Sequence, residues 1–416
     1  MNSQKRVIIE SISTEIEGGL YAAKAVIGKL FPVEADIYAD GNYVLNAELL
    51  FRHESQKKWQ KVSFKPLSND RWHVAFRVEK QGYYFYKIQA SINHALSWQM
   101  QIDRKIKDNQ KVHVELSDGI PYLKFIKEKC NKSETRKIVE WIAIFEDKKQ
   151  YSLAVQEVQS TSLKEMLNKY SPRTNVSEYD KNLQVYVDRQ KAFFSSWYGI
   201  FPRSTSKTEG THGTFKDCER LLPRIADMGF DTLYFPPIHP IGKDNRRGKN
   251  GTFPAKPGDV GSPWSIGGQE GGHKAIHPEL GILKDFKELL KTAENYGIEI
   301  ALDLAFQCSP NHPYIKKYPQ WFTWKSDGTL QCAENTSWKT PDIIPFNFET
   351  EDLENLQEEL LSIIFYWIEQ GVNIFRIDKP HEKPFLFWEW IIKRVKKKYP
   401  DIIFLAGSVT RPKLMN

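Results

Sequence analysis

The sequence lacks any long hydrophobic run. None of its apolar stretches approaches the roughly 18 residues that a membrane-spanning helix needs, and its first residues do not form the apolar core of a secretory signal. Both absences predict a soluble protein, with the cytoplasm as its default compartment and no membrane partner. Hydrophobic residues make up 40% and charged residues 27% of the 416 residues, which are the values of a globular chain with room for two or three domains.

Cysteine is scarce, and charge of one sign is not concentrated. The four cysteines show no Cys-x-x-Cys spacing, which predicts reduced structural thiols rather than a metal centre or a disulfide framework. The net charge of +7 is mild for this length, and the basic cluster at 393–398 closes a predicted helix, where cations stabilise the helix dipole. We therefore expect no nucleic-acid partner. Aromatic residues are plentiful at 13%, and they suit either a carbohydrate-binding surface or a large core.

The first hundred residues alternate apolar and polar side chains. The alternation is clear at 72–78, and clusters of glycine, asparagine and aspartate separate such segments. This pattern predicts an antiparallel β-sandwich over residues 1–104. From 105 to 179 the apolar period becomes helical, which predicts a helical insertion. The alternating segment 183–187 predicts a strand that returns to the sandwich near residues 180–190.

From residue 191 onward an amphipathic helix, a glycine and an apolar strand recur. Glycine closes a helix by adopting the left-handed conformation, and strands that are apolar on both faces suit a parallel sheet. The repeat predicts a (β/α) TIM-type barrel over 191–416 that is incomplete, with about five of the eight strands. The fold class is therefore multidomain, a β-sandwich with a helical insertion followed by a partial barrel. Strands are predicted at 197–201, 233–235, 298–304, 374–377 and 402–406, and helices at 215–228, 283–296, 353–370 and 385–399.

The strand at 374–377 runs directly into a charged pair. In a (β/α) barrel, residues at the carboxyl end of a strand point into the active-site mouth, so Asp378 lies where a nucleophile is expected. Arg376, two residues earlier, faces the same way, and its guanidinium would keep the aspartate ionised. A structural ion pair beneath a loop is the alternative interpretation.

Six motifs occur in order around this pair. They are Phe-Pro-Arg-Ser at 201–204, Phe-Pro-Pro-Ile-His-Pro-Ile-Gly at 235–242, Gly-Gly-His at 271–273, Ala-Leu-Asp-Leu-Ala-Phe-Gln-Cys-Ser-Pro at 301–310, Phe-Arg-Ile-Asp at 375–378 and Thr-Arg-Pro-Lys-Leu-Met at 410–415. Together they resemble the maltosyltransferase family of the α-amylase superfamily, which extends α-1,4-glucan from maltose 1-phosphate. The resemblance runs from the sandwich to the last residue, and it implies no metal and no organic cofactor.

The resemblance also implies roles for individual residues. In such retaining enzymes an aspartate attacks the anomeric carbon while a glutamic acid about 5 Å away protonates the leaving group and later deprotonates the acceptor. By position, Asp378 matches the nucleophile, and Asp303 and Arg376 match residues that order the sugar subsite. The implied donor and phosphate pocket contains Lys249, Gln307 and Asn335.

Several positions depart from the family pattern. Gly407 stands where the family has its acid/base glutamate, Lys379 stands where it has asparagine, and Trp338 and Thr340 interrupt a Lys-Lys-Tyr run near the phosphate. The last of these puts donor phosphate binding in question, and glycine cannot transfer a proton. The chain also ends before the strand that would carry the third catalytic carboxylate, so we expect little or no activity.

Other interpretations of the same features stay open. The chain is predicted to be an impaired maltosyltransferase, a non-catalytic module that binds glucan or assembles with a partner, or an α-amylase-like hydrolase. A homodimer, or a partner chain that supplies the rest of the barrel, is expected. The glycine-rich segment 267–272 lacks the context of a nucleotide loop. His239, His273 and His381 fit hydrogen-bonding roles better than metal ligation.

Overall fold

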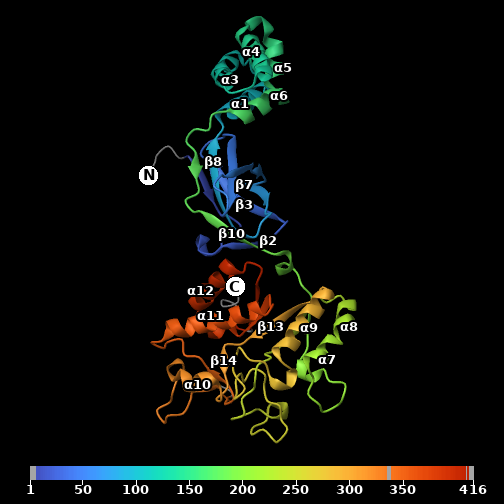
Figure 1. The fold of residues 1–416 in the computed structure, drawn as a ribbon. Helices are drawn as coiled ribbons and strands as arrows, with labels where there is room; N and C mark the ends of the chain where they lie inside the picture. Colours follow the sequence, from blue (N-terminus) through green and yellow to red (C-terminus); the bar gives the residue numbers. More distant parts are fainter. Residues whose placement is uncertain (1–5, 335–338, 409, 412–416) are drawn as a thin grey trace. The chain divides into compact units, whose positions relative to one another are not determined.

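The computed structural model describes residues 6–334, 339–408 and 410–411. The chain divides into two compact units, residues 1–190 (unit 1) and residues 191–416 (unit 2), shown in Figure 1. In the described ranges, no helix combines the length and the apolar character that crossing a membrane requires. All four cysteines are free.

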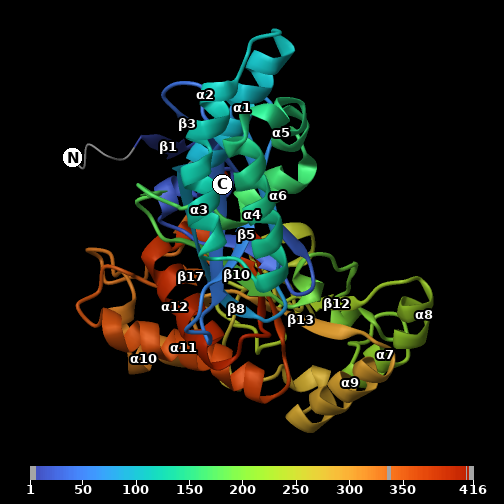
Figure 2. The ribbon, with the colours of Figure 1, turned by 90° about the horizontal axis from the view of Figure 1, so that it is seen from above.

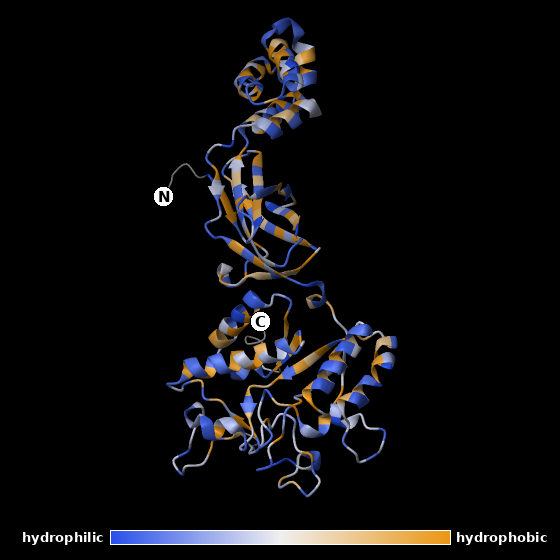
Figure 3. Cartoon of the chain, viewed as in Figure 1, coloured by the Kyte–Doolittle hydropathy of each residue, from blue (hydrophilic) through white to orange (hydrophobic). Residues whose placement is uncertain are grey.

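Unit 1 begins with a β-sandwich. Buried and less buried residues alternate along its long strands, and Figure 3 shows apolar and polar residues alternating there as well. The inward side chains of both sheets form one hydrophobic core. One sheet contains β1 (Val7–Glu10), β3 (Leu30–Ala39), β7 (Arg71–Arg77) and β6 (Lys65–Pro66), in that order. The other contains β2 (Ala23–Val26), β10 (Leu183–Asp188), β8 (Gly82–Ile92), β4 (Leu45–His53) and β5 (Gln60–Ser63), with β9 (Ser177–Glu178) paired to β8.

The helical part of unit 1 starts earlier than the sequence pattern predicts. Helix α1 begins at His94, directly after β8, whereas the predicted boundary lies at 105. The reason is a helix cap: the Asn93 side-chain oxygen accepts the Leu96 backbone N–H at 2.9 Å. The helices are α1 (His94–Lys107), α2 (His113–Asp118), α3 (Ile120–Lys127), α4 (Lys132–Glu146), α5 (Tyr151–Val158) and α6 (Thr161–Tyr170).

Unit 2 is built on a parallel sheet whose strands follow one another in chain order. They are β11 (Trp197–Gly199), β12 (Thr232–Phe235), β13 (Glu299–Leu304), β18 (Ile374–Asp378) and β19 (Ile403–Gly407). Among the described residues, β11 and β19 each pair on one side only. The prediction of a partial barrel with about five parallel strands is therefore confirmed for this part of the chain.

Helices connect the strands of unit 2 and share a large core with them. The predicted helix at 215–228 is divided into α7 (Phe215–Glu219) and α8 (Leu222–Asp227), because Pro223 has no N–H to donate and lies in the first turn of α8. The other helices are α9 (Leu283–Asn295), α10 (Pro313–Lys317), α11 (Leu353–Glu369) and α12 (Phe385–Lys398). In Figures 1 and 2, α7 lies beside α9, and α11 lies beside α12.

Candidate functional site

The candidate site lies at the carboxyl ends of β13 and β18. Asp303 on β13 is in register with Arg376 on β18, and Asp378 is the last residue of β18. Side chains two residues apart on a strand point to the same face, so Arg376 and Asp378 share one face. The alternation of the sequence thus brings two carboxylates and one guanidinium together.

Arg376 bridges the two carboxylates. Its Nη1 donates to Asp378 Oδ1 at 2.6 Å and to Asp303 Oδ2 at 3.0 Å. The Asp303 side chain has no exposed surface, that of Asp378 is 13% exposed, and that of Arg376 is 26% exposed. The guanidinium charge acts to lower the pKa of Asp303, and its hydrogen bond holds Asp378 in one orientation.

Asp303 has two further donors that the sequence analysis missed. Tyr234 Oη donates to Asp303 Oδ2 at 2.5 Å, and Trp264 Nε1 donates to the same oxygen at 3.2 Å. Burial nevertheless raises the pKa of Asp303 to about 6, against the opposing effects of the Tyr234 hydrogen bond and the Arg376 charge. Tyr234 lies in a strand that was interpreted only as apolar, and Trp264 lies in a loop, so neither carried a signal of its own.

Gly407 lies directly across from Asp378, in register on the neighbouring strand. A side chain here would stand beside the aspartate, where a retaining enzyme needs its second carboxyl group. In this structure the Arg376 guanidinium fills that space, because a Cβ built on Gly407 would collide with its Nε and Cζ. Because Gly407 has no side chain, the Arg376 guanidinium can occupy this space.

Lys379 follows Asp378 in a left-handed backbone conformation, with φ +44°. Asparagine, which the family resemblance expects at this position, adopts that conformation more readily than lysine does. The Lys379 side chain is 46% exposed and its Nζ lies 3.3 Å from a Glu382 carboxylate oxygen. The contact turns the ammonium toward Glu382 instead of leaving it unpaired.

Gln307 is connected to this cluster through Trp264. It lies on β14 (Gln307–Cys308), which pairs with β17 (Ile344–Pro345). Its Nε2 donates to the Trp264 backbone oxygen at 3.1 Å, while the Trp264 indole reaches Asp303. The loop that contains Trp264 thus links the Gln307 side chain to Asp303.

Within the described part of the chain, neither Lys249 nor Thr340 makes a hydrogen bond to the cluster. Lys249 lies in a short 3-10 helix (Lys249–Gly251), and its recorded hydrogen bonds use its backbone oxygen, which accepts from Thr252. The Thr340 hydroxyl donates to the Ala333 backbone oxygen at 2.6 Å. Asn335 and Trp338 lie outside the described residues.

The glycine-rich segment 267–272 encloses a histidine instead of a phosphate. A Cβ on either Gly267 or Gly272 would collide with the His312 ring. The segment forms a tight turn in which Gly268 and Gly271 exchange backbone hydrogen bonds. Only glycine permits this approach, and the backbone of Gly267 has φ +103°.

The enclosed ring belongs to a chain of neutral histidines. His312 Nδ1 accepts the Tyr314 backbone N–H at 3.0 Å, so its proton lies on Nε2 and is donated to His273 Nδ1 at 3.0 Å. His273 in turn donates from Nε2 to the Ala305 backbone oxygen at 3.1 Å. Burial lowers the pKa of His312 to about 3, so the pair stays neutral and positions the backbone just before Gln307.

The remaining histidines of the motifs also make hydrogen bonds. His239 Nδ1 lies 3.0 Å from the Ala275 backbone oxygen, and burial lowers the pKa of His239 to about 4. His381 Nδ1 lies 2.8 Å from the Ser408 hydroxyl. Both contacts fix loops that follow strands of the sheet.

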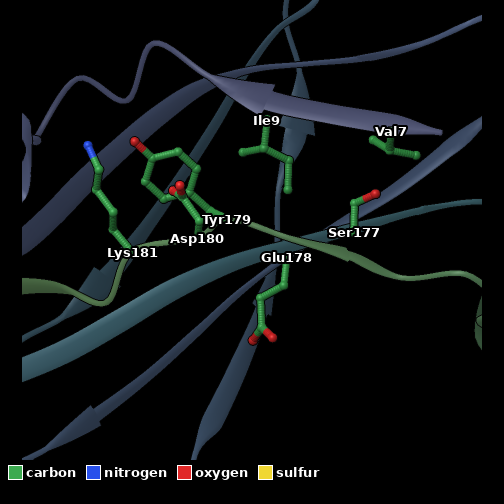
Figure 4. Close-up of a pocket in the computed structure, with 7 residues that line it drawn as sticks. All are labelled: Val7, Ile9, Ser177, Glu178, Tyr179, Asp180 and Lys181. Carbon is green, nitrogen blue, oxygen red and sulfur yellow. The ribbon is translucent and has the colours of Figure 1, made fainter. Parts of the chain in front are cut away.

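Unit 1 has a hollow of about 340 Å³ beside β1 and β9, shown in Figure 4. It is lined by Val7, Ile9, Ser177, Glu178, Tyr179, Asp180 and Lys181. The Tyr179 hydroxyl donates to Glu15, and Lys181 Nζ donates to the same carboxylate at 2.6 Å. Two of its polar side chains are thus already paired within unit 1, and the hollow lacks the carboxylate and arginine arrangement of the strand ends.

Parallel strands whose carboxyl ends carry two carboxylates bridged by an arginine define unit 2 as a partial domain of the (β/α)-barrel type. Comparisons with known proteins give the family. A family model described as α-1,4-glucan:maltose-1-phosphate maltosyltransferase, domain N/S, matches residues 5–189. The chain belongs to the α-1,4-glucan:maltose-1-phosphate maltosyltransferase family, as its relatives confirm over the whole sequence.

Two relatives of that name illustrate the match. The protein from Methylacidiphilum infernorum is 46% identical over 416 residues, which are 100% of this chain and 62% of that protein. A protein from Cereibacter sphaeroides is 41% identical over 412 residues, which are 99% of this chain and 69% of that protein. The chain therefore spans less than two thirds of the first of these relatives. Among solved structures, an α-amylase from Lactobacillus plantarum is 30% identical and matches 52% of this chain and 45% of that chain, with a TM-score of 0.44.

Proposed function

We propose that unit 2 carries the donor half of a maltosyl-transfer site for maltose 1-phosphate and α-1,4-glucan, with Asp378 as the nucleophile. We further propose that this chain transfers maltosyl groups very slowly or not at all. One observation carries the proposal: Gly407 stands in register with Asp378, and Arg376 fills the space where an acid/base side chain would stand.

The missing carboxyl group affects the two chemical steps differently. Phosphate leaves as a stable anion and needs less protonation than a sugar, so attack by Asp378 on the donor suffers less. The second step needs a base to remove the proton from the incoming glucan hydroxyl, and Gly407 offers none. Loss of general acid and base help slows such reactions by a factor on the order of 10²–10⁴.

The test is incorporation of labelled maltose from maltose 1-phosphate into glycogen. We expect a rate below about one hundredth of that of the Methylacidiphilum infernorum relative under the same conditions. An Asp378→Asn variant of this chain gives the background. If this chain incorporates maltose at the rate of the relative and Asp378→Asn abolishes that incorporation, the proposed impairment is wrong and the role of Asp378 is supported.

Non-catalytic glucan binding is a second candidate function. It is favoured by the cluster of Asp303, Arg376 and Asp378, which keeps its hydrogen bonds although Gly407 cannot act as an acid. Hydrolysis of the α-amylase type requires the same missing acid and is disfavoured for that reason. Titration calorimetry with maltoheptaose tests binding, and we expect Asp303→Asn to weaken it if the cluster contacts the sugar.

Assembly and location complete the proposal. The strands β11 and β19 each have one unpaired side among the described residues, so a partner chain that adds strands would cover them. A homodimer is the alternative, and light scattering after gel filtration distinguishes the two from a monomer.

We place the protein in the cytoplasm, where fractionation of cells that produce it should recover it.

A further inference from the structure

Two loops of unit 2 bring together His212, His277 and Glu279, none of which belongs to the Asp303, Arg376 and Asp378 cluster. His212 lies between β11 and α7, and His277 precedes the short 3-10 helix Pro278–Leu280, which contains Glu279. One potential ligand atom of each residue lies within 4.8 Å of the other two. The two imidazole rings stack with centroids 5.3 Å apart and planes 7° apart.

The hydrogen bonds of the two rings indicate which nitrogen of each could bind a metal. His212 Nδ1 donates to the adjacent Gly213 backbone oxygen at 2.8 Å, so its Nε2 keeps a free lone pair. His277 Nδ1 accepts the Glu279 backbone N–H over 3.3 Å, a long hydrogen bond that leaves the ring proton on Nε2. To bind a metal through Nε2, the ring would move this proton to Nδ1 and lose that hydrogen bond.

A small cavity adjoins the two rings. It has a volume of about 20 Å³ and is lined by both histidines together with Pro236, Pro237 and Ile241 among others. A space of this size holds roughly one water-sized species. Glu279 is exposed, so its carboxylate can move toward the rings without leaving a packed position.

We propose that His212, His277 and Glu279 bind one Zn²⁺ ion. Two imidazole nitrogens and one carboxylate oxygen form a known zinc ligand set, with water as the fourth ligand. Imidazole favours zinc over calcium and magnesium, which prefer oxygen ligands alone. The ion would join the loop after β11 to the segment that directly precedes α9, and this site lies outside the motifs that carry the family resemblance.

A second cluster in the described part of the chain contrasts with this one. His273, Cys308 and His312 are all buried and also lie within 4.8 Å of one another. Both ring nitrogens of His273 already hold hydrogen bonds, and burial raises the pKa of the Cys308 thiol, which therefore stays protonated. Metal binding there would break a satisfied network and require a thiolate, so the cluster serves as an internal comparison.

The test is titration of the untagged full chain with ZnCl₂ in a buffer without chelators. We expect one ion per chain, and no comparable binding of Mg²⁺ or Ca²⁺. His212→Ala and His277→Ala should each weaken zinc binding at least tenfold, and Glu279→Gln should weaken it severalfold. The matched control is His94→Ala, an exposed histidine of unit 1, which should bind zinc as the unchanged chain does.

His277→Ala removes a helix cap and can unfold its turn, so Glu279→Gln is also tested by thermal unfolding. Zinc should raise the unfolding temperature of the unchanged chain and raise it less in this surface variant. Absence of zinc binding at 100-fold excess, or binding that survives His212→Ala, would overturn the proposal. Loss of binding in Cys308→Ser with His212→Ala unaffected would assign zinc to the buried cluster instead.

Discussion

Arg376 is the residue on which the strand-end cluster depends. It donates to both Asp303 and Asp378 while its guanidinium stands over Gly407, so three positions on three neighbouring strands are coupled through one side chain. A substitution at any of them changes the geometry of the others. Energetic coupling between such residues is measurable by double-mutant cycles.

Gly407→Ala should destabilise the protein. The new methyl group would displace the Arg376 guanidinium and cost one or both of its hydrogen bonds to charged partners, about 1–3 kcal/mol in the free energy of unfolding. Urea denaturation measures this loss. Gly199→Ala is the matched strand control, because its nearest contact, Tyr234, lies at 3.4 Å, and it should be close to neutral.

The displacement of Arg376 can be separated from any effect that alanine has on the strand itself. A methionine side chain at position 376 can bend away without losing a hydrogen bond. Gly407→Ala should therefore lower the free energy of unfolding much less in an Arg376→Met background. An equal cost in both backgrounds would mean that Arg376 does not occupy the space over Gly407. For the same reason Gly407→Glu alone should not restore maltosyl transfer in the labelled-maltose assay.

Asp303 should make stability depend on pH between about 4 and 6. Its pKa is raised from 3.8 to about 6 by burial, so the folded state binds a proton that the unfolded state has already lost. The free energy of unfolding therefore falls as the pH rises through this range, by up to about 3 kcal/mol in total.

The buried histidines oppose this trend and make a difference measurement necessary. The pKa values of His239 and His312 are lowered to about 4 and about 3. Their contribution to the free energy of unfolding is therefore lost as the pH falls below the unfolded pKa near 6.5. Comparing the chain with Asp303→Asn in urea denaturation series at pH 4, 5, 6 and 7 isolates the aspartate. Parallel curves for the two proteins would contradict the raised pKa.

At the level of elements, the sequence predicted the parallel strands well and the loops poorly. Apolar residues dominate β13 and β18 on either side of their charged residues, and both strands begin and end within a residue of the predicted limits. Pro223, in the first turn of α8, signalled the break between α7 and α8 in the sequence, but the helical periodicity across it favoured one continuous helix.

The candidate site was predictable only where its residues lie on strands. Asp303, Arg376 and Asp378 follow from strand alternation and the family motifs, and the structure brings them together. Trp264 comes from the long loop after β12, whose path depends on contacts such as the two backbone N–H groups of Lys243 and Asp244 donating to Asn311. No periodic pattern encodes such contacts.

The glycine-rich turn offers a second test at this scale. Gly267→Ala should destabilise the protein by more than 2 kcal/mol, because the added methyl group would collide with His312 and the backbone is left-handed. Gly258→Ala in the same loop is the matched control, since its backbone has φ +89° but nothing lies within 4 Å of the added carbon. It should cost only about 1 kcal/mol.

Urea denaturation of the two variants separates collision from backbone strain. A similar loss in both would mean that the turn 267–272 does not enclose His312 tightly. Restoration of Gly267→Ala stability by His312→Ala would point to the ring itself as the obstacle.

At the scale of the whole molecule, the two units should differ in resistance to protease. The sandwich of unit 1 pairs its long strands on both sides, whereas β11 and β19 of unit 2 each leave one side unpaired among the described residues. Limited trypsin digestion should cut first in the loop 242–272, at exposed residues such as Lys249 and Lys256, while a fragment ending near residue 190 persists.

Mass spectrometry of the digestion products identifies the cut sites. Survival of unit 2 for as long as the sandwich, in a protein shown to be a monomer, would contradict the expected weakness of the partial barrel. Protection of the loop that appears only with a strand-supplying partner would instead support assembly.

The position of Arg376 over Gly407 also has an evolutionary consequence. A side chain at 407 would meet the Arg376 guanidinium, which its hydrogen bonds to Asp303 and Asp378 hold in place. A glutamate could therefore enter this position only if the arginine moved as well. A single substitution that adds a carboxyl group here is then disfavoured, and descendants of such a chain would more easily acquire uses that do not need an acid.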